Sequence, residues 1–271
     1  MAPQAIAQRP QQLIKLPLPD LAGGPGNTKS CALHKYFVGS MEEWPNFVEE
    51  ARAAVQLAGI TGDTPVISWT SRVAATEANI NAEHVVVGAE SGVQGRVQQN
   101  IGQAMGAICK SINIDMRFAD YKAAAAPWID RKVPDMICMT TAGHLRIVGE
   151  IKTPWVKAHK LARLFTLARA KVQQLFGQIA EYMMLANMRY GFLTTYEETI
   201  FFRQILSNGS WGLQYSKPIK SSTAAQEAPT GDYEDRVSVR ECFLHLIQLA
   251  DTNHIAGSPL PMAQWVRATP I

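Results

Sequence analysis

The stretch KVPDMICMTTAGHLRIVGEIKTPW, residues 132–155, decides the fold. Two apolar runs, near 134–140 and 144–151, flank the turn sequence TTAG and predict a β-hairpin. A hairpin of this composition belongs in a core, yet charged residues stand at the end opposite the turn. They are Asp135, Glu150 and Lys152.

The spacing of these charged residues predicts that they converge. Glu150 and Lys152 lie two apart on one strand, so both side chains project from the same face. With the turn at TTAG, Asp135 reaches the same open end of the hairpin. The simplest alternative is a surface hairpin with a cross-strand ion pair, which would contribute about 0–1 kcal/mol.

Two carboxylates and an ammonium in one small volume indicate a particular chemistry. Unpaired carboxylates on a half-buried sheet face are costly, and a hard divalent cation with oxygen ligands compensates them; Mg²⁺ is the common choice. Such a metal polarises a phosphoryl oxygen and lowers the pKa of a bound water, while a lysine stabilises charge in the transition state. The pattern therefore predicts phosphodiester hydrolysis.

The same residues carry a family resemblance. PD at 134–135, followed by EIK at 150–152, resembles the PD-(D/E)xK motif of the restriction-endonuclease-like nuclease superfamily. The run GEIKTPW, with GQIAEYMMLANMRYGFLTTYEETIFFR after it, looks most like fungal and Crinkler-type versions, including some in effectors and spore-killing elements. The similarity spans roughly residues 75–250. It implies a metal-dependent nuclease, with DNA favoured over RNA.

The resemblance also implies a role for each residue of the motif. Asp135 and Glu150 would bind Mg²⁺, or Mn²⁺ in its place, together with the carbonyl of Ile151. Lys152 would orient the attacking water or screen the scissile phosphate.

Two further positions follow from the resemblance. The superfamily commonly places an acidic residue on a helix before the hairpin, and Glu90 matches best, with Glu77 and Glu83 as rivals. Some branches carry a glutamine and an aromatic residue on the following helix, which Gln178 and Tyr182 match. Glu90 would complete the acidic cluster by binding the metal directly or through a water, and Gln178 would position the nucleophile or a phosphate. The alternatives are an acid in the first turn of a helix and a polar helix edge.

A cationic strip is predicted beside the hairpin. Residues 157–188 form the longest uninterrupted helical pattern, and a helical wheel collects its basic and amide side chains in one arc. Strips of this kind contact phosphate backbones, although a basic arc is also typical of a solvated face. The residues expected to hold nucleic acid are Lys157, Lys160, Arg163, Lys171, Gln174 and Tyr182.

The rest of the chain predicts a single α/β domain with a central mixed sheet flanked by helices. Helices are expected over 47–57, closed by Gly59, and over 88–112, with Gly102 and Gly106 as a close packing seam. A strand meander follows 189, and a closing helix begins with a Ser238 cap and Glu241. We divide the chain into an extended or disordered arm (1–30), a helical and strand extension (31–75), a nuclease-like domain (76–256) with a loop at 220–236, and a tail (257–271).

Composition narrows the class of protein. The 271 residues are 47% apolar and 18% charged with a net charge of +3, as in an ordinary globular domain that tolerates an anionic partner. Four scattered cysteines predict buried free thiols rather than a zinc site. We see neither a secretory signal nor a membrane span, and expect an intracellular protein of the cytoplasm or nucleus. His144 and His159 are expected to be ordinary surface histidines.

Two rival functions remain open from the sequence. The first is a nucleic-acid-binding or protein-interaction module that keeps the nuclease fold without turnover. The second is an effector whose surface engages a host or partner protein. The sequence does not choose an oligomeric state.

Overall fold

The computed structural model describes most of the chain as one α/β domain. The described residues are 4–29, 33–60, 62–71, 85–125, 133–166, 169–207, 209–224 and 237–268. The expected loop at 220–236, the rival acids Glu77 and Glu83, and Cys31 lie partly or wholly outside these ranges. Within them, no helix combines the length and apolarity of a membrane span.

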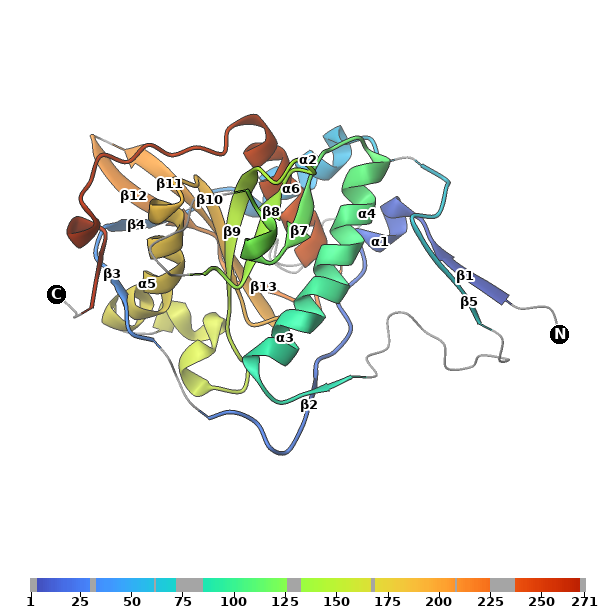
Figure 1. The fold of residues 1–271 in the computed structure, drawn as a ribbon, viewed down its shortest axis with the longest axis horizontal. Helices are drawn as coiled ribbons and strands as arrows, with labels where there is room; N and C mark the ends of the chain where they lie inside the picture. Colours follow the sequence, from blue (N-terminus) through green and yellow to red (C-terminus); the bar gives the residue numbers. More distant parts are fainter. Residues whose placement is uncertain are drawn as a thin grey trace.

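A mixed sheet of 8 strands forms the centre of the molecule (Figure 1). Its path runs β4-β12-β11-β10-β9-β8-β7, and β13 pairs with β11. The β9/β10 and β12/β4 pairs are parallel and the others antiparallel, so the expected mixed α/β sheet is confirmed. The strands are β4 (Ser40–Glu43), β7 (Arg117–Ala119), β8 (Met136–Met139), β9 (Leu145–Ile151), β10 (Tyr190–Thr194), β11 (Glu198–Ser207), β12 (Ser210–Tyr215) and β13 (Ile219–Lys220).

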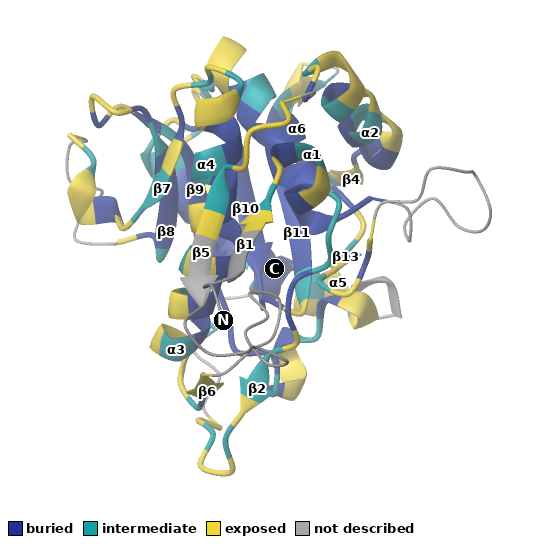
Figure 2. Cartoon of the chain, turned by 90° about the vertical axis from the view of Figure 1, so that its right-hand side faces the viewer, coloured by how far each residue is buried: buried dark blue, intermediate teal, exposed yellow. Residues whose placement is uncertain are grey.

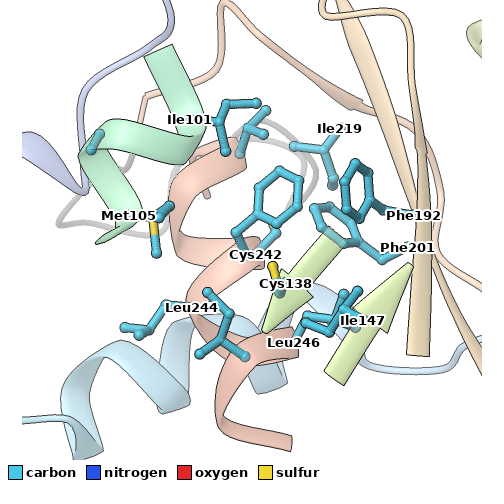
Figure 3. Close-up of a cluster of buried hydrophobic side chains, with 14 of the residues drawn as sticks. Ile101, Met105, Cys138, Ile147, Phe192, Phe201, Ile219, Cys242, Leu244 and Leu246 are labelled. Carbon is cyan, nitrogen blue, oxygen red and sulfur yellow. The ribbon is translucent and has the colours of Figure 1, made fainter. Parts of the chain in front are cut away.

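Helices cover both faces of this sheet. Alternate residues of β8 face two different cores: Cys138 lies in the first and Ile137 in the second. The first core packs against α2 (Phe47–Leu57), α3 (Glu90–Val97), α4 (Ala104–Ser111) and α6 (Val239–Thr252). Figure 3 shows it, with side chains from both the helices and the strands converging. The second core packs against α5 (Arg169–Leu185).

The hairpin of β8 and β9 has the predicted boundaries and turn. Met136 pairs with Gly149 and Ile137 with Val148. At the turn, the backbone N–H of Gly143 donates to the carbonyl of Thr140 at 2.9 Å, and Gly143 has φ +84°. Both strands are almost fully buried (Figure 2), which places the open end of the hairpin, and its charged residues, inside the molecule.

Several other sequence predictions are confirmed. Helix α2 ends before Gly59, which has φ +56°. Strands β10, β11 and β12 form the meander. At the start of α6 the Ser238 hydroxyl accepts from the Glu241 N–H, and the Glu241 carboxylate accepts from the Ser238 N–H, as in a capping box. Three cysteines are free and buried: Cys109, Cys138 and Cys242.

The long helix expected over 157–188 is wrong in its first part. Residues Lys157–His159 and Leu161–Thr166 form 3₁₀ turns, η3 and η4, and α5 begins only at Arg169. The physical reason is a side chain from β11: one carboxylate oxygen of Glu198 accepts hydrogen bonds from the N–H groups of Leu161 (2.7 Å) and Ala162 (3.1 Å). These N–H groups are therefore not available to continue a helix from 157.

The arm over 1–30, expected to be extended or disordered, contains extended strands and also a short helix that packs on the domain. Helix α1 (Pro10–Leu13) is followed by buried Ile14 and Leu18 in the first core. The buried guanidinium of Arg240 donates to the carbonyl of Leu13 at 3.0 Å. Further strands pair at the periphery: β1 (Gln4–Gln8) with β5 (Ile67–Ser71), and β2 (Ala22–Gly23) with β6 (Val86–Val87).

The carboxyl-terminal segment is part of the fold rather than a loose tail. β14 (Val266–Arg267) pairs with β3 (Tyr36–Phe37). The buried indole of Trp265 packs edge-on against Phe37 and donates its N–H to the carbonyl of Ala180 in α5 at 2.9 Å. Both ends of the described chain thus contact helices that cover the sheet, the amino-terminal segment at α6 and the carboxyl-terminal segment at α5.

Candidate active site

The charged residues of the hairpin meet at its open end. The Nζ of Lys152 forms a direct ion pair with Oε1 of Glu150 and lies 3.7 Å from Oε2 of Glu90. Oδ2 of Asp135 accepts the backbone N–H of Ile151 at 2.8 Å, which links the two strands beyond their last paired residues. The structure therefore brings together the four residues that sequence analysis placed in one site.

Glu150 and Lys152 are buried, Asp135 is half-buried, and Glu90 is the most exposed residue of the cluster. Glu150 is 1% and Lys152 3% exposed, whereas the Glu90 side chain, at the start of α3, is 46% exposed. Burying an ion pair costs desolvation free energy that can exceed the Coulombic attraction, so this pair is weak evidence for a role in stability. The surface-hairpin alternative, with an exposed cross-strand pair, does not describe this geometry.

Burial dominates the pKa values of the cluster. It raises the pKa of Glu150 well above its ordinary value, and the Asp135 charge adds to the rise while Lys152 opposes it. Burial also raises the pKa of Asp135 against the hydrogen bond from Ile151, and raises that of Glu90. For Lys152 burial alone would lower the pKa, but the Glu150 carboxylate and its hydrogen bond raise it overall. Perturbation of this kind is typical of functional sites.

The Glu150 carboxylate can accept more interactions than it makes. Within the described residues neither of its buried oxygens has a hydrogen-bond donor in proper geometry, although Oε1 contacts Lys152 as an ion pair. Buried oxygens of this kind are costly unless a cation or donor satisfies them. The donor chemistry suits a hard divalent cation.

The side-chain ligand set is small. No group of three His, Cys, Asp or Glu side chains in the described part of the chain is arranged to hold a metal. Asp135 and Glu150 supply two carboxylates, and the Ile151 carbonyl is the remaining expected ligand. Mg²⁺ is commonly bound through one or two carboxylates plus waters and substrate phosphates, so the set fits that ion. Glu90, expected as a ligand, is placed against Lys152 instead.

Helix α3 contributes a residue that sequence analysis missed. The side-chain amide of Gln94 donates to the backbone carbonyl of Asp135. Glu90 and Gln94 are four apart and share a helix face, so the first contacts Lys152 while the second holds Asp135. The i, i+4 spacing after an acidic candidate was the available signal.

Helix α5 brings Gln178 and Tyr182 to the same site. The Gln178 amide donates to the Tyr182 hydroxyl at 2.9 Å. Tyr182 is buried, and its pKa is raised by burial and next by the charge of Glu150, which places the phenol within electrostatic reach of the cluster. Tyr182 therefore belongs to the buried wall of the site rather than to an exposed nucleic-acid surface.

The cationic strip does not form as one helical arc. Lys157 and Arg163 lie on the 3₁₀ turns, Lys160 lies between them in an extended conformation, and Lys171 lies on α5 with an exposed side chain. Lys160 contacts Glu197 at 3.5 Å. The side-chain amide of Gln174 donates to the carbonyl of Leu33 at 2.9 Å.

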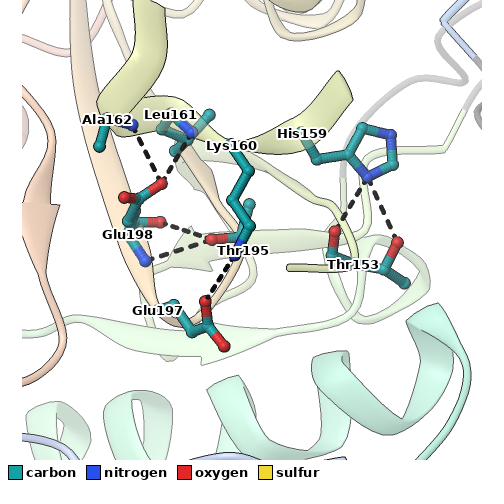
Figure 4. A network of polar contacts seen from close by, with 8 residues as sticks. All are labelled: Thr153, His159, Lys160, Leu161, Ala162, Thr195, Glu197 and Glu198. Carbon is teal, nitrogen blue, oxygen red and sulfur yellow. Dashed lines mark hydrogen bonds and ion pairs between the residues drawn. The ribbon is translucent and has the colours of Figure 1, made fainter. Parts of the chain in front are cut away.

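A polar network fixes the segment that follows Lys152 (Figure 4). His159 is buried rather than on the surface, and its Nδ1 lies 3.0 Å from the carbonyl oxygen and 3.3 Å from Oγ1 of Thr153. Burial lowers the pKa of His159, which favours a neutral ring whose Nδ1–H donates to that carbonyl. The Glu198 carboxylate and the His159–Thr153 contacts thus anchor residues 153–162, which follow Lys152.

The chain was compared with protein-family models, curated proteins and solved structures. No protein-family model, no curated protein and no solved structure matches the chain. The functional argument therefore depends on the residues of the cluster themselves.

Proposed function

We propose that the protein is a metal-dependent nuclease of the restriction-endonuclease-like class, which hydrolyses phosphodiester bonds of nucleic acid. The observation that supports this proposal is the buried Glu150 carboxylate, whose Oε1 is in an ion pair with Lys152 and whose Oε2 has no hydrogen-bond donor among the described residues. The motif resemblance favours DNA over RNA and a fungal or Crinkler-type relative, and suggests Mg²⁺ or Mn²⁺.

Each residue then has a chemical task. Asp135 and Glu150 would hold the metal through their carboxylates with the Ile151 carbonyl, and a bound Mg²⁺ supplies a polarised phosphoryl oxygen and a more acidic water. Lys152 presents its ammonium group to the scissile phosphate, where it stabilises the charge that develops. Gln94 and the Ile151 N–H keep the Asp135 side chain and backbone in position.

Asp135→Asn and Lys152→Met test this proposal. Asparagine keeps the shape of Asp135 and removes a ligand charge, while methionine fills the volume of the lysine stem without an ammonium. Both variants should lose Mg²⁺-dependent cleavage of a labelled DNA by at least a hundredfold, while their circular dichroism spectra match the wild type. The exposed Asp251→Asn serves as a charge-matched control. Wild-type cleavage by a folded Lys152→Met protein would reject the proposed site.

One observation favours the second candidate, a nuclease-fold module that binds without turnover. The direct contact between Lys152 and Glu150 engages one of the two carboxylates, and a closed pair of this kind competes with a metal. Calorimetric titration of wild type and Asp135→Ala with Mn²⁺ decides between the two. Binding that the substitution removes supports the nuclease, and its absence in the wild type supports the module. A third outcome would support an effector that engages a partner protein. In that case a partner would bind wild type and Glu150→Ala equally well, and digestion of nucleic acid in the sample would not weaken the binding.

A further inference from the structure

A groove runs along the helix that carries Glu90 and Gln94. Helices α3 and α4 are joined by the π-helical segment η1 (Gln98–Gln103), and Figure 1 shows them as one continuous rod beside β7. The groove, with a volume of about 980 Å³, lies between this rod and the segment around β7. It includes Gly95, the residue after the Gln94 that contacts Asp135, so it starts next to the candidate active site.

The walls of the groove combine apolar side chains, from Ile114, Met116 and Phe118, with polar ones. Its side chains include three amides from η1, one from the α4–β7 connection, and two cations. Among the described residues, none of these six side chains makes a hydrogen bond or an ion pair. They are Gln98, Gln99, Gln103, Lys110, Asn113 and Arg117.

The groove also contains one acid, whose carboxylate is already engaged. Asp115 accepts hydrogen bonds from the backbone N–H of Thr141, at 2.9 Å, and from its hydroxyl. These hydrogen bonds lower the pKa of Asp115, so it stays ionised and tied to the β8–β9 turn. With Lys110 and Arg117, the formal charge of the groove is +1 (two cations and one acid).

Glycines shape the groove. Gly102 brings the rod close to the sheet, because an added Cβ would lie 3.1 Å from the Phe118 Cβ. Gly95 and Gly106 face open space, with no atom within 4 Å of an added Cβ. A helix face without side chains at these points lets another backbone approach closely, and π-helical segments are frequent at functional sites.

We propose that this groove binds a single strand of nucleic acid on one side of the bond to be cut. Phosphates meet the two cations, and base edges, which an unpaired strand leaves open, meet the amides. From Gly95 to Lys110 the rod is about 22 Å long, which accommodates about six nucleotides at 3.4 Å each. The inference rests on the proposed function, because the strand assigned to the groove is the substrate of the adjacent site.

Fluorescence anisotropy with labelled 12-nucleotide single strands, DNA and RNA, in EDTA measures this binding without cleavage. Lys110→Ala/Arg117→Ala should weaken binding at least tenfold and reduce the slope of log affinity against log salt by about 1.4, since two phosphate contacts are lost. The control Lys217→Ala/Arg267→Ala removes two exposed cations that do not line the groove. Equal losses in both pairs, or no loss in the groove pair, overturn the proposal.

A steric variant separates binding from folding. Gly106→Leu replaces a helix-weakening residue by a good helix former, so its melting temperature should equal or exceed that of wild type while oligonucleotide affinity falls at least tenfold. Wild-type affinity of this variant overturns the proposal. If the groove variants cleave as well as wild type in the presence of metal, the groove proposal is rejected and the nuclease proposal stands. Groove-dependent binding without any cleavage rejects the nuclease assignment alone.

Discussion

Gly149 is the residue where β9 allows no side chain. It follows Val148 and precedes Glu150 on the strand, and an added Cβ would lie closer than 3.0 Å to the ring of Phe192 on β10. The glycine therefore permits an aromatic ring of the first core to pack directly over the backbone that presents Glu150.

Gly149→Ala should destabilise the protein by about 1–3 kcal/mol, because the Phe192 ring must move in a close-packed core. The matched control is Gly106→Ala, where an added Cβ meets no atom and alanine should stabilise α4 by up to about 1 kcal/mol. Urea denaturation of both variants measures the two effects. Equal free energies of unfolding for the two proteins would contradict the packing described here.

His245 makes stability depend on pH. Its ring packs against Trp44 and Phe47, with Nε2 3.3 Å from a carboxylate oxygen of Glu50. Burial lowers the pKa of His245 against the opposing effect of Glu50, while Arg203 adds to the lowering. The unfolded chain thus binds this proton more readily than the folded one, and stability falls as the pH drops below the ordinary value of 6.5.

His245→Phe should make the loss of stability between pH 7 and pH 5 smaller than in wild type, because no proton is then taken up at this position on unfolding. Glu50→Gln should make the loss larger, since it removes the carboxylate that favours the protonated ring. Chemical denaturation at several pH values measures both slopes. A steeper slope for His245→Phe would show that another group controls the effect.

At the scale of elements, local patterns predicted what local interactions decide. The alternation of β8 and β9, the glycine turn and the Ser238–Glu241 capping box each lie within a few residues, and each is confirmed. The start of α5 was wrong because Glu198, far along the chain, holds the N–H groups of Leu161 and Ala162. A helical wheel of residues 157–188 cannot show a hydrogen bond to a residue that lies outside the segment.

The sequence predicted the charged residues of the candidate site, but not the residues that hold them in position. The spacing of Asp135, Glu150 and Lys152 on two strands of a hairpin implied their convergence. The contacts of Gln94 and His159 depend on how a helix and a 3₁₀ turn pack against that hairpin. Such packing is a tertiary property: the i, i+4 spacing places Gln94 on the same helix face as Glu90, but does not show which backbone group that face contacts.

Arg240 joins three elements and supports a prediction at this scale. From α6 its guanidinium donates to the carbonyl of Asn100 in η1, at 2.8 and 3.0 Å, and to that of Leu13 in α1 at 3.0 Å. Burial lowers its pKa to about 10, so the group stays charged at neutral pH.

Arg240→Met should destabilise the protein by at least about 2 kcal/mol, because it removes the charged donor of three buried hydrogen bonds to the carbonyls of Asn100 and Leu13. Hydrogen exchange should also become faster in residues 10–18, where the arm loses its link to α6. The exposed Arg267→Met is the control and should leave both measurements near wild type. Unchanged exchange in the arm would show that Arg240 does not hold it.

The whole molecule gives a further test of the metal site, because a ligand that binds only the folded state stabilises it. At a concentration of Mn²⁺ one hundred times its dissociation constant, the wild type should gain about 2.7 kcal/mol. Asp135→Asn should gain little, since one of two carboxylate ligands is lost. Thermal melts with and without Mn²⁺ measure the difference. An equal gain in both proteins would place the bound ion elsewhere.

The burial of Trp265 has a consequence for biosynthesis. Its indole contacts α5 at Ala180, so the helical layer that covers the second core is completed only after residue 265 has been synthesised. Synthesis proceeds at about 5–20 residues per second, and the ribosome therefore needs several seconds after Leu185 to deliver this tryptophan. During that interval the nascent protein exposes apolar surface to chaperones, and a premature stop codon just after α6 would yield an aggregation-prone product.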